Sequence, residues 1–235
     1  RFPDSFEQLY DALRQVFYPF VARFYAAGDT VQVTDLVNTL LRVLSFLAVL
    51  ATLGVVLFGS DIIVLVFSDK YLPSVPAFVL LMVLLSLTVI DYTMGYTLVA
   101  IGQPDKPALI NVFHALFTIG AQLLLIPRYG ILGAAMAGII SIAIVNPLFV
   151  YFLRRQVIRV NAFSFLQSLL VLVIFAGLIY QFSTASWNIV GKALILLVYV
   201  GLGFLLSIIR WDDVRVMLDA FRPLFEKYVI RRSSA

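Results

Sequence analysis

Residues 131–152, ILGAAMAGIISIAIVNPLFVYF, contain no charged side chain. At 1.5 Å per residue a helix of this length reaches about 33 Å, enough to cross a hydrocarbon core of about 30 Å. Five further apolar runs have similar length, and a helix is the open-ended structure that satisfies every backbone group in lipid. The sequence therefore predicts an all-α polytopic helical membrane protein with six transmembrane helices, the other five at residues 36–58, 77–101, 108–126, 163–182 and 190–209.

The composition argues against a water-soluble domain, because 62% of the 235 residues are hydrophobic and only 13% are charged. The chain has no cysteine, which excludes disulfides and thiolate metal sites. It also lacks a Walker A sequence, a dinucleotide glycine fingerprint, HExxH and GxSxG. We therefore expect no enzyme activity, no cofactor, no metal and no nucleic-acid partner. The chain begins at Arg1 without a signal sequence, so we expect it to be part of a longer protein.

Basic residues are sorted between the two ends of the predicted spans. If the first segment is cytoplasmic, fourteen Lys and Arg residues lie on the cytoplasmic side, and only Lys70, Arg128 and Lys192 lie opposite. The positive-inside rule favours this orientation, with both ends of the chain in the cytoplasm of a bacterial inner membrane. The fourteen are Arg1, Arg14, Arg23, Arg42, Lys106, Arg154, Arg155, Arg159, Arg210, Arg215, Arg222, Lys227, Arg231 and Arg232.

Two segments are predicted to be amphipathic helices that do not span. Residues 5–27 begin with a capping-box pattern, carry apolar residues at helical spacing, and are followed by Gly28 as a stop signal. Residues 211–228 have an apolar face opposite a charged one, and two arginines follow them. The second helix is expected to lie in the cytoplasmic membrane interface, and a solvated tail is the alternative.

Inserting an ionisable side chain into a span costs on the order of 3 kcal/mol. The ionisable residues inside the predicted spans are therefore candidate functional groups. Asp91 is either a carboxylate for ion coupling that faces an aqueous cavity or a hydrogen-bonded tie between helices. Arg42 shares a helical face with Asn38, and both are candidates for substrate binding. A guanidinium suits a phosphate, whereas the alternative is an Arg42 side chain that reaches the membrane interface.

The third span carries a polar stripe of Asn111, His114, Thr118 and Gln122. Such a stripe is expected to face protein or water, so Asn111 and Gln122 are further candidates for substrate binding. His114 is the single histidine, and it is either a hydrogen-bonded interior residue or an ion-coupling group.

The fourth span has small residues at positions that let helix backbones approach closely. Gly130, Ala134 and Gly138 are four residues apart, which predicts close packing of helices. Asn146 and Pro147 interrupt the same span and could open its hydrogen-bond ladder.

Three stretches resemble motifs of bacterial polysaccharide flippases of the multidrug/oligosaccharidyl-lipid/polysaccharide exporter superfamily. They are ALRQVFYPFVARFYAAGD at residues 12–29, VAIGQPDKP at 99–107 and LLIPRYGILGAAMA at 124–137. The motifs occur in the family's order, and the resemblance covers about residues 6–155. It implies the second lobe of a MATE-like flippase fold, with residues 1–30 as a preceding helix end and connection, 31–155 as a partial transport lobe, 156–209 as two additional helices and 210–235 as an interfacial helix and tail.

The resemblance also implies a function. Such proteins move undecaprenyl-phosphate-linked oligosaccharides across the inner membrane by alternating access, for O-antigen, lipopolysaccharide or exopolysaccharide biosynthesis. The implied partners are the lipid-linked oligosaccharide, membrane lipids, a glycan polymerase and export machinery. Two alternatives are a MATE-type drug or cation antiporter and a membrane polymerase or ligase of polysaccharide synthesis.

Overall fold

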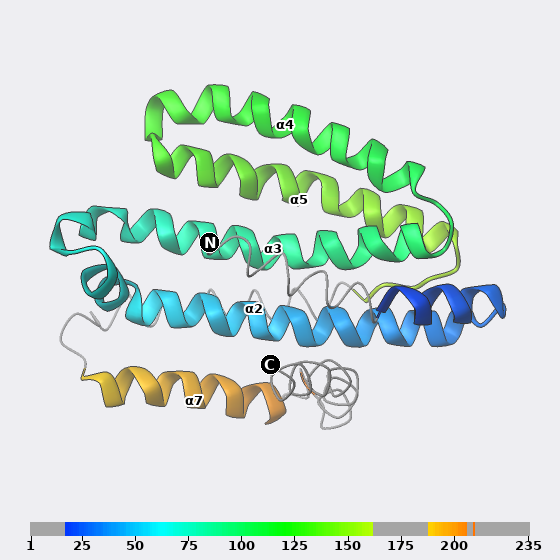
Figure 1. Ribbon diagram of the computed structural model, residues 1–235, viewed down its shortest axis with the longest axis horizontal. Coiled ribbons are helices and arrows are strands. Elements are labelled where there is room, and N and C mark those ends of the chain that lie inside the picture. The colour runs from blue at the N-terminus through cyan, green and yellow to red at the C-terminus, as the bar shows by residue number, and fades with distance from the viewer. Residues whose placement is uncertain (1–16, 162–187, 206–208, 210–235) are drawn as a thin grey trace, which may run out of the picture.

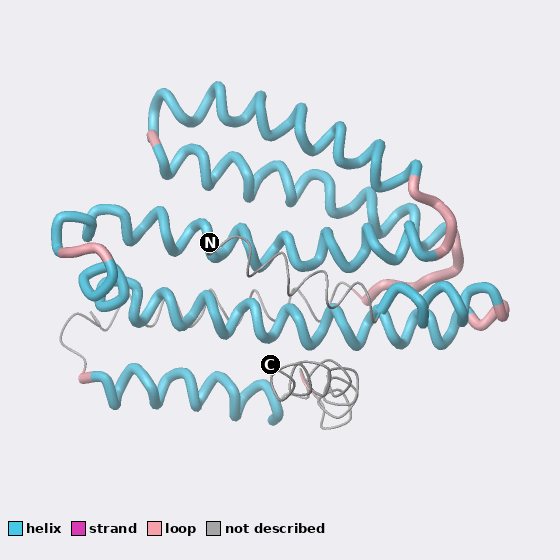
Figure 2. Tube along the Cα trace, in the orientation of Figure 1, coloured by secondary structure: helices cyan, strands magenta, loops and turns pink. Residues whose placement is uncertain are grey.

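The computed structural model describes residues 17–161, 188–205 and 209 (Figure 1). The described residues form helices and loops without a strand, which confirms the predicted all-α fold (Figure 2). Residues 17–26 are helical, and a 3-10 helix, η1 (Asp69–Ser74), connects the first two long helices. The labelled α-helices are α2 (Thr30–Val66), α3 (Val75–Ala100), α4 (Asp105–Tyr129), α5 (Ile131–Arg155) and α7 (Ile189–Leu205).

Four predicted spans are confirmed as helices that are long and apolar enough to cross a membrane. The spans predicted at 36–58, 77–101, 108–126 and 131–152 correspond to α2, α3, α4 and α5. The span predicted at 190–209 corresponds to α7, a shorter apolar helix of 17 residues. The predicted span at 163–182 and the predicted amphipathic helix at 211–228 lie outside the described residues.

The first helix ends where the sequence predicts. Gly28 has a φ of +76°, which glycine adopts without steric cost. The amide of Gly28 donates to the Tyr25 carbonyl at 3.0 Å, and the amide of Asp29 donates to the Phe24 carbonyl at 3.0 Å. The Asp29 carboxylate then accepts a hydrogen bond from the Gln32 amide at 2.9 Å and caps α2. The turn at Gly28 therefore sets residues 17–26 beside the start of α2 (Figure 1).

The prolines differ in their effect on the helices. Pro76 lies in the first turn of α3, where a missing amide costs little. Pro127 lies inside α4, which continues through it to Tyr129. The chain reverses instead at Gly130, which has a φ of +57° and separates α4 from α5.

The long helices pack side by side with α5 between α3 and α4. Across the view of Figure 1 the order is α4, α5, α3, α2 and α7. The contacts agree, since α5 packs along both α4 and α3, while α3 and α4 touch little. Because successive helices run in opposite directions, the α3–α4 connection and the end of α5 share one end of the bundle. The α2–α3 connection and the α4–α5 turn share the other end.

Two buried hydroxyl groups stabilise the contact between α2 and α3. The Thr52 and Ser86 oxygens lie 2.8 Å apart. Each hydroxyl also lies within hydrogen-bond distance of both the Ala48 and the Met82 carbonyl. Because hydrocarbon supplies no competing partner, these bonds hold α2 and α3 in register.

Small residues of α5 allow close packing of helices, as predicted for Gly138, whereas Gly130 forms the turn before α5 and a Cβ atom there would meet nothing within 4 Å. A Cβ atom on Gly133 would lie 2.3 Å from the Leu125 carbonyl oxygen of α4. A Cβ atom on Gly138 would lie 2.8 Å from the Leu84 side chain of α3. Gly133 therefore sets the distance between α4 and α5, and Gly138 sets the distance between α5 and α3.

Helix α7 docks on α2 through one aromatic pair. The rings of Phe46 and Tyr199 stack with centroids 4.9 Å apart, and the Tyr199 hydroxyl donates to the Phe46 carbonyl at 3.2 Å. A Cβ atom on Gly203 would lie 2.2 Å from the Phe46 ring, so the ring occupies the space that a side chain would need. Near one end of the bundle, Lys192 of α7 forms an ion pair with Asp61 of α2.

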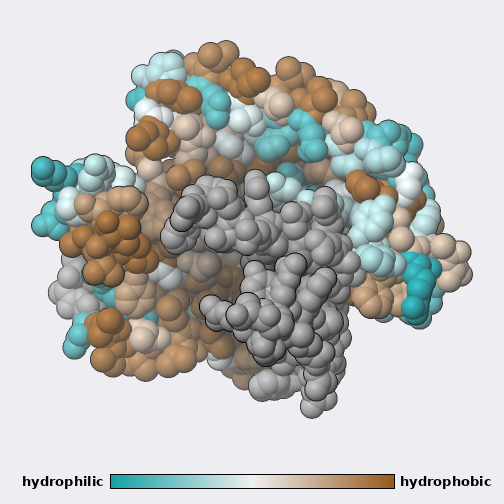
Figure 3. Space-filling view, in the orientation of Figure 1, coloured by the Kyte–Doolittle hydropathy of each residue, from teal (hydrophilic) through white to brown (hydrophobic). Residues whose placement is uncertain are grey.

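The outer surface is apolar, as a lipid-facing surface must be. Leu123 and Leu124 of α4 are 72% and 73% exposed, and Leu197 of α7 is 65% exposed. Hydrophobic side chains cover much of the face seen in Figure 3, and a hydrophilic group lies over the middle of α4. The chain is therefore a multi-pass membrane protein.

Replacing Gly133 with alanine is expected to destabilise the protein. The new Cβ atom would overlap the backbone of α4, and such overpacking costs about 1–3 kcal/mol. Thermal unfolding in detergent would measure the loss. Gly54→Ala is the matched control, because a Cβ atom there would meet nothing within 4 Å and alanine favours the helix. Equal stability of the two variants would contradict the close approach at Gly133.

The absence of cysteine allows the predicted orientation to be measured by single-cysteine labelling. Lys70 lies in η1 and Arg155 ends α5, so the two residues lie at opposite ends of the bundle. In intact cells a membrane-impermeant maleimide is expected to label Lys70→Cys and to label Arg155→Cys only after permeabilisation. Labelling of both variants in intact cells would contradict the topology, and the reverse pattern would contradict the orientation.

Candidate functional site

Polar residues of α3 and α4 meet in a pocket of about 550 Å³, which we call the α3–α4 pocket. Three of the six residues predicted to be functional line it, namely Asp91 from α3 and Asn111 and His114 from α4. The described residues that line it are Thr88, Asp91, Tyr92, Gly95, Tyr96, Val99, Pro104, Pro107, Ala108, Asn111, His114 and Phe149.

The helix packing explains why a space remains between α3 and α4. Both helices lie against α5 rather than against each other. Phe149 of α5 contributes to the lining and lies 3.5 Å from the position of a Cβ atom on Gly95. Pro104 and Pro107, from the connection and the first turn of α4, line the pocket as well. The pocket therefore extends from the α3–α4 connection toward the middle of the bundle.

Asp91 is the one acidic residue that lines the pocket. Its Oδ1 atom is buried and has no hydrogen-bond partner among the described residues. The nearby Thr88 hydroxyl donates to the Leu84 carbonyl at 2.9 Å, so its proton is already used within α3. No Lys or Arg is among the described residues that line the pocket. Within the described part of the chain, the carboxyl group thus has no counter-charge in the pocket, although buried acids are usually paired.

The other polar groups of the pocket include an amide, an imidazole and two phenol groups. Asn111 is exposed and His114 is partly buried, on the face of α4 that turns toward the pocket. The rings of Tyr92 and Tyr96 stack with centroids 5.8 Å apart. Sequence reasoning found Asn111 and His114 from their spacing and Asp91 from its charge inside a span, but it did not place Pro104, Pro107 or Phe149 at this site. Nothing in the local sequence indicates that a phenylalanine of α5 reaches this pocket.

Asn38 is held by the segment that follows α5. Its amide nitrogen donates to the Arg159 carbonyl at 3.0 Å, and its amide oxygen accepts from the Asn161 amide at 2.8 Å. Ile158 and Val160 of the same segment are buried in the core that α2, α3 and α5 form. This arrangement gives Asn38 a structural role, and its predicted role in substrate binding stays a prediction.

Arg42 and Gln122 lie outside the α3–α4 pocket. Arg42 is partly buried on α2, and its Nη2 atom donates to the Thr39 hydroxyl at 3.3 Å. Gln122 lies two turns further along α4 than His114. The described residues contain no group of three His, Cys, Asp or Glu side chains that could hold a metal ion.

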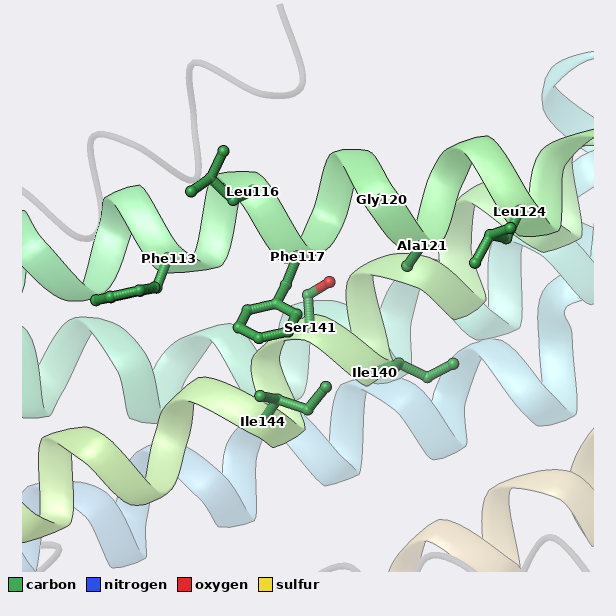
Figure 4. Close-up of a pocket in the computed structure, with 9 residues that line it drawn as sticks. All are labelled: Phe113, Leu116, Phe117, Gly120, Ala121, Leu124, Ile140, Ser141 and Ile144. Atoms are coloured by element: carbon green, nitrogen blue, oxygen red, sulfur yellow. The ribbon is translucent and has the colours of Figure 1, made fainter.

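A second pocket, of about 450 Å³, lies between α4 and α5 and is apolar (Figure 4). Phe113, Phe117 and Leu124 of α4 face Ile140 and Ile144 of α5 in it. Ser141 is the one hydroxyl there, and it donates to the Ala137 carbonyl at 2.8 Å. This pocket offers no free polar group, so it can contact only apolar material.

Antiparallel apolar helices with a polar pocket among them are the arrangement of a membrane transport protein. The family model of the lipid II flippase MurJ matches residues 9–200, and the chain belongs to this family. No curated protein and no solved structure matches the chain.

The family match confirms the main functional expectation at a coarser level. A flippase for a lipid-linked substrate is confirmed, and so is the expectation that the protein is not an enzyme. The family description names lipid II, a peptidoglycan precursor, whereas the sequence motifs had suggested oligosaccharides for O-antigen or other surface polysaccharides. The match does not support that narrower assignment or a MATE-like antiporter. It also does not support a glycan polymerase or export machinery as partners.

Replacing Asn38 with alanine is expected to lower stability by about 1–2 kcal/mol, because two hydrogen bonds to residues 159–161 are lost. Asn111→Ala is the matched control, since Asn111 is exposed in the pocket. Thermal unfolding in detergent would compare the two variants. If Asn38→Ala unfolded at the wild-type temperature, the structural role of Asn38 would be wrong.

Proposed function

We propose that the full protein flips lipid II from the cytoplasmic to the outer leaflet of a bacterial inner membrane by alternating access. The observation that carries the proposal is the family match over residues 9–200, which includes α2, α3, α4 and α5 and most of α7. Moving a polar headgroup across hydrocarbon requires a polar path between helices, and the α3–α4 pocket supplies part of such a path.

Arg42 is our candidate for the pyrophosphate of the lipid. A guanidinium group recognises phosphate oxygens through two parallel hydrogen bonds. Arg42 lies within the membrane-spanning part of α2, about 18 Å from its first residue at 1.5 Å per residue. The α3–α4 pocket is less suitable for this anion, because a carboxyl group lines it and no basic side chain does.

The orientation that the charges predict fits this direction of transport. The α3–α4 connection, at the same end as Arg154 and Arg155, would lie in the cytoplasm. The α3–α4 pocket extends from that connection, so it would be reached from the leaflet in which the precursor is loaded.

Flipping is best measured with the purified full-length protein in liposomes that contain fluorescent lipid II. Accessibility of the label to an impermeant quencher reports the movement. The wild-type protein is expected to move lipid II faster than an undecaprenyl-pyrophosphate-linked oligosaccharide or a cationic dye. Faster movement of the oligosaccharide would replace lipid II by the substrate that the sequence motifs suggested, and transport of the dye alone would favour an antiporter.

Arg42→Ala is expected to reduce the rate of flipping about ten-fold or more, because a charge-assisted contact to phosphate is lost. Arg42→Lys is expected to retain part of the rate, since it keeps the charge but not the two-pronged geometry. Arg128→Ala is the control, because Arg128 lies in the last turn of α4 at the opposite end of the bundle. A wild-type rate in Arg42→Ala would remove Arg42 from the mechanism.

A further inference from the structure

The α3–α4 pocket has the chemistry of a site for a cation, although the proposed substrate is a pyrophosphate. Its lining combines the Asp91 carboxyl with the rings of Tyr92 and Tyr96, the Asn111 amide and the His114 imidazole. Lys and Arg do not occur among the described residues that line it. A carboxylate beside aromatic rings attracts a positive charge through Coulomb energy and through the negative faces of the rings.

The size of the pocket distinguishes an organic cation from a bare ion. A volume of about 550 Å³ lies in the range of sites for small organic molecules, roughly 300–1,000 Å³. A metal ion instead needs several ligands that converge on one point. The described residues offer no cluster of three His, Cys, Asp or Glu side chains for that purpose.

A purely structural role for Asp91 does not fit the contacts. The pair of Thr52 and Ser86 shows how this protein ties two helices together, with each hydroxyl bonded across the α2–α3 contact. The Oδ1 atom of Asp91 has no such partner among the described residues, yet it is buried at the wall of a pocket. An unpaired buried carboxyl oxygen is costly unless a ligand satisfies it.

We propose that the α3–α4 pocket binds a primary ammonium group on the headgroup of the lipid-linked substrate, with Asp91 as its ion-pair partner. This inference rests on the proposed function, because the headgroup of a peptidoglycan precursor includes a peptide that can carry an amine. Tyr92 and Tyr96 present aromatic faces to the cation, and the Asn111 amide oxygen accepts one of its hydrogen bonds.

The position of the pocket suits a headgroup that enters from one end of the bundle. Asp91 lies nine residues before the end of α3 at Ala100, which is about 14 Å along the helix. Pro104 and Pro107 line the pocket at the connection itself. A peptide that enters at this connection could therefore extend along α3 until its amine reaches Asp91.

The test compares lipid II that has a free side-chain amine with the same lipid after acetylation of that amine. Binding of both lipids to the purified full-length protein in detergent would be measured by native mass spectrometry. The wild-type protein is expected to bind the free amine about ten-fold more tightly, because acetylation removes the charge and the ion pair. Asp91→Asn is expected to bind both lipids equally, and Asp91→Glu to keep part of the preference.

Asp69→Asn is the matched control, since Asp69 is an exposed acid in η1 outside the pocket and should leave the ten-fold preference unchanged. Equal binding of the two lipids by the wild-type protein would overturn the amine site and leave the proposed function standing. A preference for the free amine that survives in Asp91→Asn would overturn the role of Asp91. Binding of the acetylated lipid that Na⁺ alone makes as tight as binding of the free amine would overturn it as well. If neither lipid bound, the proposed function would fail as well.

Discussion

The structure depends on one constraint: inside hydrocarbon a polar group must find its partner within the protein. The hydroxyl groups of α3 and α5 obey it locally, since Thr88, Thr93, Thr97 and Ser141 each donate to the carbonyl four residues earlier. Thr52 and Ser86 obey it across a helix contact. The Oδ1 atom of Asp91 lacks a partner among the described residues, and it lies where three helices leave a pocket. Ser45, Thr118 and Asn146 also have a buried polar atom without a partner among the described residues, but these three residues do not line the α3–α4 pocket. Asp91 therefore stands out by its position at the pocket, where our proposal gives it a ligand.

The same constraint explains why small residues organise the bundle. Apolar side chains gain little by leaving lipid for a protein interior, so close backbone approach must supply the packing energy. Gly133 and Gly138 bring α5 against α4 and α3, and Gly203 lets α7 accept the Phe46 ring of α2. With α5 held between them, α3 and α4 diverge enough to leave the pocket. Gly133 and Gly138 thus help to shape the α3–α4 pocket without lining it.

The sequence predicts the helices well and their neighbours poorly, for a physical reason. A long apolar run is a local property, so the spans at 36–58, 77–101, 108–126 and 131–152 could be read from composition alone. Predicting the pocket requires the knowledge that α5 separates α3 from α4, and no local sequence pattern encodes this order of helices. Asn38 illustrates the limit, because its bonds reach residues that lie 121 and 123 positions further along the chain. The polar stripe of α4 predicted that Asn111 and His114 face protein, but not that Asp91 lies opposite them.

The separation of Arg42 from Asp91 bears on how a flippase selects its cargo. A basic residue alone would accept any lipid pyrophosphate, because the phosphate groups of such lipids are alike. An acidic pocket adds a second condition, since its carboxyl group repels an anionic headgroup and attracts a cationic one. On the proposed function, Arg42 would recognise the pyrophosphate that all these lipids share. Asp91 would recognise the headgroup amine that distinguishes one of them. Motifs for helix packing can then resemble those of polysaccharide flippases while the cargo differs, because packing and selection depend on different residues.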